Sequence, residues 1–266
     1  MNKTLRLALS CVLFPFAAAA VPSDEATVRV ITFNIHHGVG LDEKLDLARI
    51  GALIQEQQAD IVALQEVDRG VERTAKRDLP AELAALTGMH VYFDPNIRYQ
   101  GGDYGNAVLT KFPIKQAKNS PLTMIGKGEQ RGVIQLVLDV RGTDVLFMDT
   151  HLDSRKDEAE RVGSVDELAQ IIAAAGKMPV ILCGDFNTAP KSQAHEKLKK
   201  VIDDTWELIG QGDGFSIPVG RPTKRIDYLW ISPATIEPLQ IKVLRSDASD
   251  HLPVFGEFRL RAPAGK

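Results

Sequence analysis

The stretch VILCGDFNTAP, residues 180–190, begins as an apolar run and then carries two polar residues, Asp185 and Asn187. Successive side chains of an extended chain point to opposite faces, so Asp185 and Asn187 face one way and Phe186 faces the other. The following Thr-Ala-Pro is typical of a turn, where Asp and Asn are common. The spacing therefore favours either an ordinary turn or two polar groups that share one pocket at the end of a strand.

Other apolar runs of the chain also end in side chains that bind metals or transfer protons. Each one alone has a structural explanation, as a turn residue, an edge charge, a buried histidine or a cap. Together they are harder to explain in this way, because buried carboxylates are strongly destabilising unless they are paired or bound to a metal. The set implies a cation or a shared proton network, and its further members are Asn34, Glu66, His151, Asp227, Asp250 and His251.

These side chains need a framework in which several strand ends meet. Helical spacing covers residues 45–58, 79–88 and 156–175, and no repeat or low-complexity linker interrupts the chain. Some strands are close enough for hairpins and others are joined by helices, which predicts two packed sheets with helices outside them. We expect one domain over residues 21–266. The strand-like runs are 28–34, 60–67, 105–114, 133–140, 144–152, 179–187, 225–232 and 253–260.

The ordered motifs TFNIHHG, LQEVD, YGNAVLTKFPI, THLD, GDFN, IDYLW and SDHLPV resemble the endonuclease/exonuclease/phosphatase superfamily. That superfamily includes DNase I-like nucleases, apurinic endonucleases, neutral sphingomyelinases and inositol polyphosphate phosphatases. The resemblance covers the chain from Val28 to Leu260. It implies an α/β fold, a four-layered αββα sandwich of two mixed sheets flanked by helices, with the active site at one end of the sheets. It also implies hydrolysis of phosphoester bonds.

The resemblance further implies a Mg²⁺ or Mn²⁺ cofactor, a hard cation that prefers carboxylate and amide oxygens. Glu66 is the principal metal ligand that we expect, with Asn34 and Asp250 beside it. By the same resemblance, Asp185 orients or deprotonates the attacking water, and Asn187 binds the phosphate. No Cys or His cluster has the spacing of a structural zinc site.

The same resemblance implies roles for the histidines and for residues at the rim of the active site. Asp227 would hold His251 as an imidazolium that stabilises the charge of the transition state, and His151 would do the same from the other side. His36 and Asn106 are the candidate substrate contacts. The segment with Asn106 also describes a flexible glycine-rich loop. Four cations after Glu66 either attract a phosphorylated substrate or form a solvated charged loop: Arg69, Arg73, Lys76 and Arg77.

The N-terminus, MNKTLRLALSCVLFPFAAAAVPSDEA, has the order of a secretory signal peptide. Lys3 and Arg6 are followed by an apolar stretch and by small residues before a cleavage point near Ala20. We expect a signal over residues 1–20 and an exported protein, periplasmic or secreted, without a transmembrane segment. Lipid attachment at Cys11 is the alternative. Of the two cysteines, Cys183 alone remains in the mature chain, as a buried and inert thiol.

The net charge of the chain and its differences from particular subfamilies restrict the classes of substrate that we expect. Removing the signal takes away two cations and no acid, which changes the formal charge from −3 to −5 and disfavours tight, non-specific binding to nucleic acid. Asp68 stands where apurinic endonucleases usually have a Lys, and no apolar hairpin insertion of the sphingomyelinase kind is visible. We expect a monomeric phosphodiesterase or phosphatase for extracellular nucleic acid, a phospholipid head group or a small phosphoester. An extracellular DNase-type nuclease and a catalytically silent binding module on this fold are the alternatives.

Overall fold

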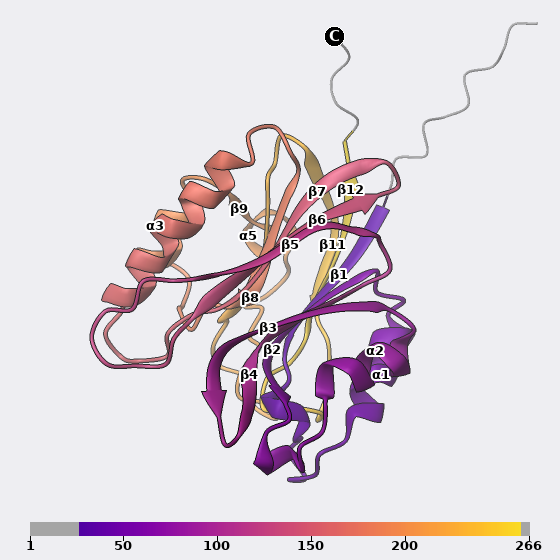
Figure 1. Cartoon of the computed structure of the whole chain (residues 1–266). Helices are drawn as coiled ribbons and strands as arrows, with labels where there is room; N and C mark the ends of the chain where they lie inside the picture. Colours follow the sequence, from indigo (N-terminus) through magenta and orange to yellow (C-terminus); the bar gives the residue numbers. More distant parts are fainter. Residues whose placement is uncertain (1–26, 262–266) are drawn as a thin grey trace, which may run out of the picture.

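Two six-stranded sheets pack against each other at the centre of the protein (Figure 1). The computed structural model describes residues 27–261, so the predicted signal peptide over residues 1–20 and the lipid site at Cys11 lie outside the described residues. Within residues 27–261, no helix has the length and apolar character needed to cross a membrane.

The first sheet has the strand order β11-β12-β1-β2-β4-β3, and the second has the order β5-β6-β7-β8-β10-β9. Both sheets are mixed, because β1 pairs in parallel with β2 and β7 pairs in parallel with β8, whereas the other pairs are antiparallel. The strands of the first sheet are β1 (Thr27–Asn34), β2 (Ile61–Arg69), β3 (His90–Tyr99), β4 (Gly102–Thr110), β11 (Ile236–Val243) and β12 (Val254–Leu260). Those of the second are β5 (Ile114–Pro121), β6 (Gly132–Val140), β7 (Thr143–His151), β8 (Val180–Asp185), β9 (Asp203–Asp204) and β10 (Asp227–Ile231).

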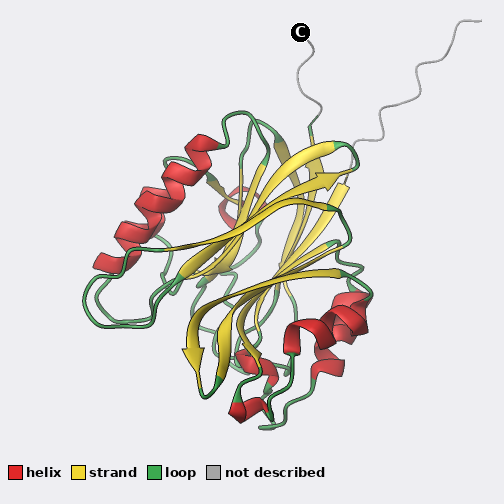
Figure 2. Cartoon of the chain, in the orientation of Figure 1, coloured by secondary structure: helices red, strands yellow, loops and turns green. Residues whose placement is uncertain are grey.

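Helices cover the outer face of each sheet (Figure 2). On the first sheet lie α1 (Leu47–Glu56) and α2 (Leu79–Thr87), and on the second lie α3 (Ala159–Ala174) and α4 (Gln193–Leu198). The short helix α5 (Thr205–Ile209) packs near β10 and β11, and η1 (His36–Gly38) and η2 (Glu72–Thr74) are 3₁₀ turns. The arrangement confirms the predicted four-layered αββα sandwich.

Side chains alternate between the two faces of each strand. Their apolar residues form three layers, one between the sheets and one between each sheet and its helices. In β1, Val28 and Val30 face the second sheet, whereas Ile31 and Phe33 face the helices on the other side. Because both faces of the central strands are buried, those strands are apolar almost throughout. For this reason the central strands could be predicted from the sequence.

The structure differs from the sequence prediction at the edges of the sheets. The predicted strand over residues 105–114 is two strands, because β4 ends at Thr110 and β5 begins at Ile114. Pro113, which has no N–H to donate to a ladder, lies in the connection between them. The two-residue strand β9 was not predicted, and neither were three longer strands, namely β3, β5 beyond Ile114, and β11. Each of the three longer strands is at or next to solvent on one edge of its sheet, so its polar and apolar residues mix.

Leu136 in β6 is fully buried between the sheets, and Leu239 in β11 is 37% exposed. We expect Leu136→Ala to lower the free energy of unfolding by about 2–5 kcal/mol, because it leaves a cavity in a packed layer. Leu239→Ala is the matched control and should change it by less than about 0.5 kcal/mol. Urea unfolding of both variants measures the difference, and equal losses would contradict the assignment of the core.

Candidate active site

Four parallel strands end at the same edge of the sandwich and carry most of the predicted polar residues. In the first sheet, Asn34 ends β1 and Glu66 lies near the end of β2. In the second sheet, His151 ends β7 directly opposite Asp185 at the end of β8. The antiparallel strand β10 begins at this edge, where Asp227 pairs with Asp185. Topology therefore gathers residues that are far apart in the sequence.

Asn34 connects the two sheets at this edge. Its amide nitrogen donates to Asp185 Oδ2 at 3.1 Å and to Glu66 Oε1 at 3.0 Å, and its amide oxygen accepts from the backbone N–H of His36 at 3.1 Å. The Ser249 hydroxyl donates to the backbone carbonyl of Asn34 at 2.7 Å. This bond holds the loop that carries Asp250 and His251 beside the end of β1.

Asp185, Asp227 and His251 form a buried chain of charges. His251 Nδ1 lies 2.9 Å from Asp227 Oδ2, and its Nε2 lies 3.7 Å from Asp185 Oδ2. Asp227 Oδ2 also accepts from the Ser216 hydroxyl at 2.5 Å. The predicted pairing of Asp227 with His251 is therefore present in the structure, with Asp185 on the far side of the imidazole.

Burial and neighbouring charges shift the protonation of this chain. Burial, together with the nearby Asp227 carboxylate, raises the pKa of Asp185 to about 7, although His251 opposes the shift. Burial disfavours a charged His251, but Asp227 and Asp185 outweigh it and raise the pKa of His251 to about 10. At neutral pH, His251 is an imidazolium and Asp185 is poised to exchange a proton.

His151 differs from the expectation that it would be a second imidazolium. Burial, Arg131 and His251 all lower the pKa of His151 well below its ordinary value, so the ring is neutral. A neutral ring accepts a hydrogen bond at one nitrogen only. Arg131 Nη1, a donor, lies 3.2 Å from His151 Nδ1, and the side-chain amide nitrogen of Asn187, also a donor, lies 3.1 Å from Nε2. That nitrogen lies 3.5 Å from Asp185 Oδ2. His151 is thus a neutral hydrogen-bonding group beside the Asp185 carboxylate.

Asn187 and Asn106 hold this neighbourhood in place. The backbone N–H of Asn187 donates to Asp185 Oδ1 at 2.9 Å, and its side-chain amide donates to the carbonyl of Leu152 at 3.1 Å. Asn106 is buried in β4. In the amide orientation that satisfies both of its polar atoms, its oxygen accepts from the backbone N–H of His151 at 3.3 Å. The structure gives Asn106 a positioning contact, and its contact with substrate stays a prediction.

Gly184, next to Asp185, leaves no room for a side chain beside the strand that carries His151. Gly184 has a φ of +143° and pairs with Thr150, and a Cβ at this position would collide with the Thr150 carbonyl oxygen. Glycine is the residue that tolerates both this backbone and this approach.

Glu66 offers the oxygen ligands that a hard cation needs. Its half-buried carboxylate has one hydrogen-bond partner among the described residues, the Asn34 amide, which leaves coordination sites free. Because Asn34 turns its nitrogen toward Glu66, its amide oxygen does not face the same space. The half-buried Asp250 accepts from the Ser249 hydroxyl at 3.2 Å. The carboxylates therefore fit a divalent metal, while the ligand roles of Asn34 and Asp250 stay predictions.

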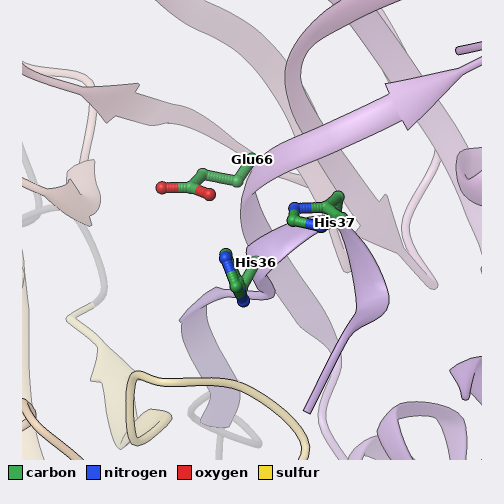
Figure 3. Close-up of side chains that lie close together, drawn as sticks. All are labelled: His36, His37 and Glu66. Carbon is green, nitrogen blue, oxygen red and sulfur yellow. The ribbon is translucent and has the colours of Figure 1, made fainter. Parts of the chain in front are cut away.

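His36 and His37 lie beside Glu66 (Figure 3). Their ligand nitrogens and a Glu66 oxygen are all within 4.8 Å of one another. Each of the three residues has a positive φ, 44°, 45° and 59° in chain order. Such a backbone costs about 1–2 kcal/mol for a residue other than glycine. Asp185, Asp227 and His251 form another group of the same kind within the described chain.

Sequence reasoning missed Arg131 and did not predict the partners of Arg73. Arg131 is buried and donates to Glu129 and His151, but it precedes β6 in a segment without any motif that would mark it. Arg73 is exposed, and its guanidinium pairs with the buried Asp68 at 2.8 and 2.9 Å and lies over the ring of Tyr104.

The family model described as "Endonuclease/Exonuclease/phosphatase family" matches residues 31–251. The chain belongs to the endonuclease/exonuclease/phosphatase family. Its members are hydrolases of phosphoester bonds that depend on divalent metals. The matched range contains the whole cluster from Asn34 to His251.

Similar proteins agree with membership of the endonuclease/exonuclease/phosphatase family. The uncharacterized protein YbhP of Escherichia coli (strain K12) is 27% identical over 252 residues, which cover 90% of this chain and 98% of YbhP. An endonuclease/exonuclease/phosphatase from Beutenbergia cavernae is 26% identical, with a TM-score of 0.73 over 88% of this chain and 72% of that chain. The mannosyl-6-phosphatase Bt3783 of Bacteroides thetaiotaomicron shares the fold, with 19% identity and a TM-score of 0.74 over 87% of this chain and 99% of that chain.

The pKa of His251 gives a direct test of the site. Nitrogen-15 NMR of the imidazole should show a midpoint near 10 in the wild-type protein. Because the folded-state pKa is raised above 6.5, the charged ring stabilises the fold below pH 6.5, and this contribution is lost as the pH rises through 10. Asp227→Asn removes the paired charge and should lower the midpoint by about 1–3 units. An unchanged midpoint in Asp227→Asn would show that the two groups are not paired in solution.

Proposed function

We propose that this protein is an exported, Mg²⁺- or Mn²⁺-dependent phosphoesterase that hydrolyses its substrate by in-line attack of an activated water. The observation that carries the proposal is the setting of Asp185. This carboxylate is buried, is held by hydrogen bonds from Asn34 and Asn187, and lies between the nitrogens of His151 and His251. A base fixed between two ring nitrogens is well placed to orient one water toward a phosphorus atom.

In this mechanism, Asp185 accepts a proton from the attacking water as the new P–O bond forms. The bond to the leaving oxygen breaks on the opposite side of the phosphorus. His251 is kept positive by Asp227 and stabilises the negative charge that builds on the phosphate oxygens. His151 stays neutral beside Asp185, and Asn187, whose amide nitrogen lies 3.1 Å from His151 Nε2, contacts the phosphate.

Glu66 would hold a divalent metal, which would supply charge neutralisation at the phosphate and at the leaving oxygen. Asn34 contributes by holding Glu66 and Asp185 in one arrangement, since its amide nitrogen donates to both carboxylates. Arg131 contributes by fixing the ring of His151.

The substrate is a phosphodiester or a phosphomonoester, in extracellular nucleic acid, a phospholipid head group or a small molecule. The family name covers both nucleases and phosphatases, and a structural relative is a mannosyl-6-phosphatase. We therefore include both ester classes in the test. A DNase-type activity is one outcome of that test, and the absence of any hydrolysis would support a silent binding module.

The purified mature protein should hydrolyse bis-p-nitrophenyl phosphate, p-nitrophenyl phosphate or a natural phosphoester in the presence of Mg²⁺ or Mn²⁺. Asp185→Asn should lower kcat by about 10²–10⁴-fold, because the base is lost while the shape is kept. Glu66→Gln should raise the Mg²⁺ concentration needed for half-maximal rate. Asp139→Asn is a matched control at the opposite end of β6, where Asp139 pairs with Lys115 near the surface. Full activity of Asp185→Asn, or activity of the wild type in excess chelator, would refute the proposal.

Export can be tested independently of activity. Fusion of residues 1–25 to a reporter should direct the reporter out of the cytoplasm, because this segment has basic, apolar and small-residue regions in the order of a signal peptide. Replacing Lys3 and Arg6 by Glu should reduce the export of the reporter. Mass spectrometry of the native protein should find an N-terminus near Val21, and a cytoplasmic protein that retains Met1 would contradict the prediction.

A further inference from the structure

The turn after β1 places two histidines beside the carboxylate of Glu66. His36 and His37 are consecutive in η1, and their rings meet edge to face with centroids 4.4 Å apart (Figure 3). Glu66 comes from the neighbouring strand β2, at the irregularity where the pairing of β2 with β4 shifts register. Two elements thus present two imidazoles and one carboxylate to the same space.

The two rings are unlike the three buried histidines of the chain. The rings of His151, His195 and His251 are each hydrogen-bonded to other side chains. In contrast, no hydrogen bond joins the ring of His36 or His37 to another residue in the described range 27–261, and Nδ1 of His37 is buried without a partner. A buried polar atom without a partner is costly, and a ligand bound at His37 Nδ1 would remove that cost.

The backbone is strained at the same three residues. His36, His37 and Glu66 all have positive φ angles, as do eight other non-glycine residues of the described range, all of them in turns or loops. Strained conformations persist only where the surroundings hold them, and they concentrate at functional sites. Here the turn is held by hydrogen bonds from Ile35 N–H to the Gln65 carbonyl and from His36 N–H to Asn34 Oδ1, each 3.1 Å long.

We infer that His36, His37 and Glu66 form a binding site for a transition-metal ion, with two imidazole nitrogens and one carboxylate oxygen as ligands. The inference rests on the proposed function only through Glu66, which would serve both this ion and the proposed catalytic metal.

The donor set decides the class of ion. Imidazole nitrogen favours Zn²⁺, Co²⁺, Ni²⁺ and Fe²⁺, whereas Mg²⁺ and Ca²⁺ take oxygen ligands. The ligand atoms lie within 4.8 Å of one another, which is wider than in a site that holds an ion. The side chains must therefore rotate toward the ion when it binds. Arg73, which acts on His37, would oppose a cation, but Asp68 balances its charge through two hydrogen bonds.

Co²⁺ titration of the full mature protein provides the test, because the visible absorption of Co²⁺ reports its ligands. His36→Asn and His37→Asn suit the turn, since asparagine tolerates positive φ better than most residues. We expect the double variant to bind Co²⁺ at least about tenfold more weakly than the wild type and to lose the nitrogen-ligand bands. Glu66→Gln should weaken binding as well. His90→Asn is the matched control, because His90 is exposed at the start of β3 and should leave the titration unchanged.

A second measurement needs no variant. Zn²⁺ added to wild-type protein labelled with nitrogen-15 histidine should shift the ring signals of His36 and His37 and leave that of His90 in place. Unchanged Co²⁺ affinity and spectrum in the double variant, or unshifted His36 and His37 signals at saturating Zn²⁺, would overturn the inference.

Hydrolysis by the same proteins separates this inference from the proposed function. Wild-type hydrolysis of bis-p-nitrophenyl phosphate with Mg²⁺, together with Co²⁺ binding that ignores both histidines, would refute the transition-metal site and leave the phosphoesterase standing. Co²⁺ binding that requires both histidines, in a protein that hydrolyses no phosphoester, would support the site and refute the function. A loss of hydrolysis in His36→Asn without any change in Co²⁺ binding would instead make His36 a substrate contact and overturn the inference.

Discussion

The hydrogen bond from Asn34 to Asp185 joins the two sheets at the edge where the polar side chains gather. It spans 151 positions of sequence and is buried, so its geometry depends on how the apolar layer holds the sheets apart. A second buried bond, from Gln65 to Asp149 at 2.7 Å, crosses the same layer. Gln65 precedes Glu66, and Asp149 is two residues before His151. The two bonds therefore fix the strands that carry Glu66 and Asp185 relative to each other.

The charges of the site follow from its burial. Asp185 and Asp227 are both excluded from water, and one imidazolium, His251, lies between them. Burial, and then the positive charges of Arg131 and His251, lower the pKa of His151 and disfavour a second imidazolium there. The cluster can thus exchange a proton at Asp185 while it keeps a fixed positive group for a phosphate. A polar network of this kind stabilises the fold only when its members stay paired.

Central strands and strand-end residues could be predicted from the sequence, for a simple reason. A strand buried on both faces is apolar throughout, so Asp185 after VILCG and Asn34 after VITF stand out against it. In edge strands such as β5, polar and apolar residues are interspersed, so a polar residue at the strand end does not stand out. Arg131 was missed because its role comes from the fold, which brings the segment before β6 against the end of β7. The protonation of His151 was mispredicted for the same reason, since the sequence does not show that Arg131 is its neighbour.

The close approach of β7 and β8 at Gly184 has a consequence for how the protein can vary. A side chain at position 184 would collide with the Thr150 carbonyl and push it away. The distance between His151 and Asp185 would then change. At most positions around an active site, a residue can be replaced by a larger or smaller one because neighbouring side chains adjust. Position 184 has no such latitude, because its neighbour is a backbone atom in a paired strand. The spacing of Asp185 from His151 therefore depends on the backbone at position 184, which tolerates no side chain.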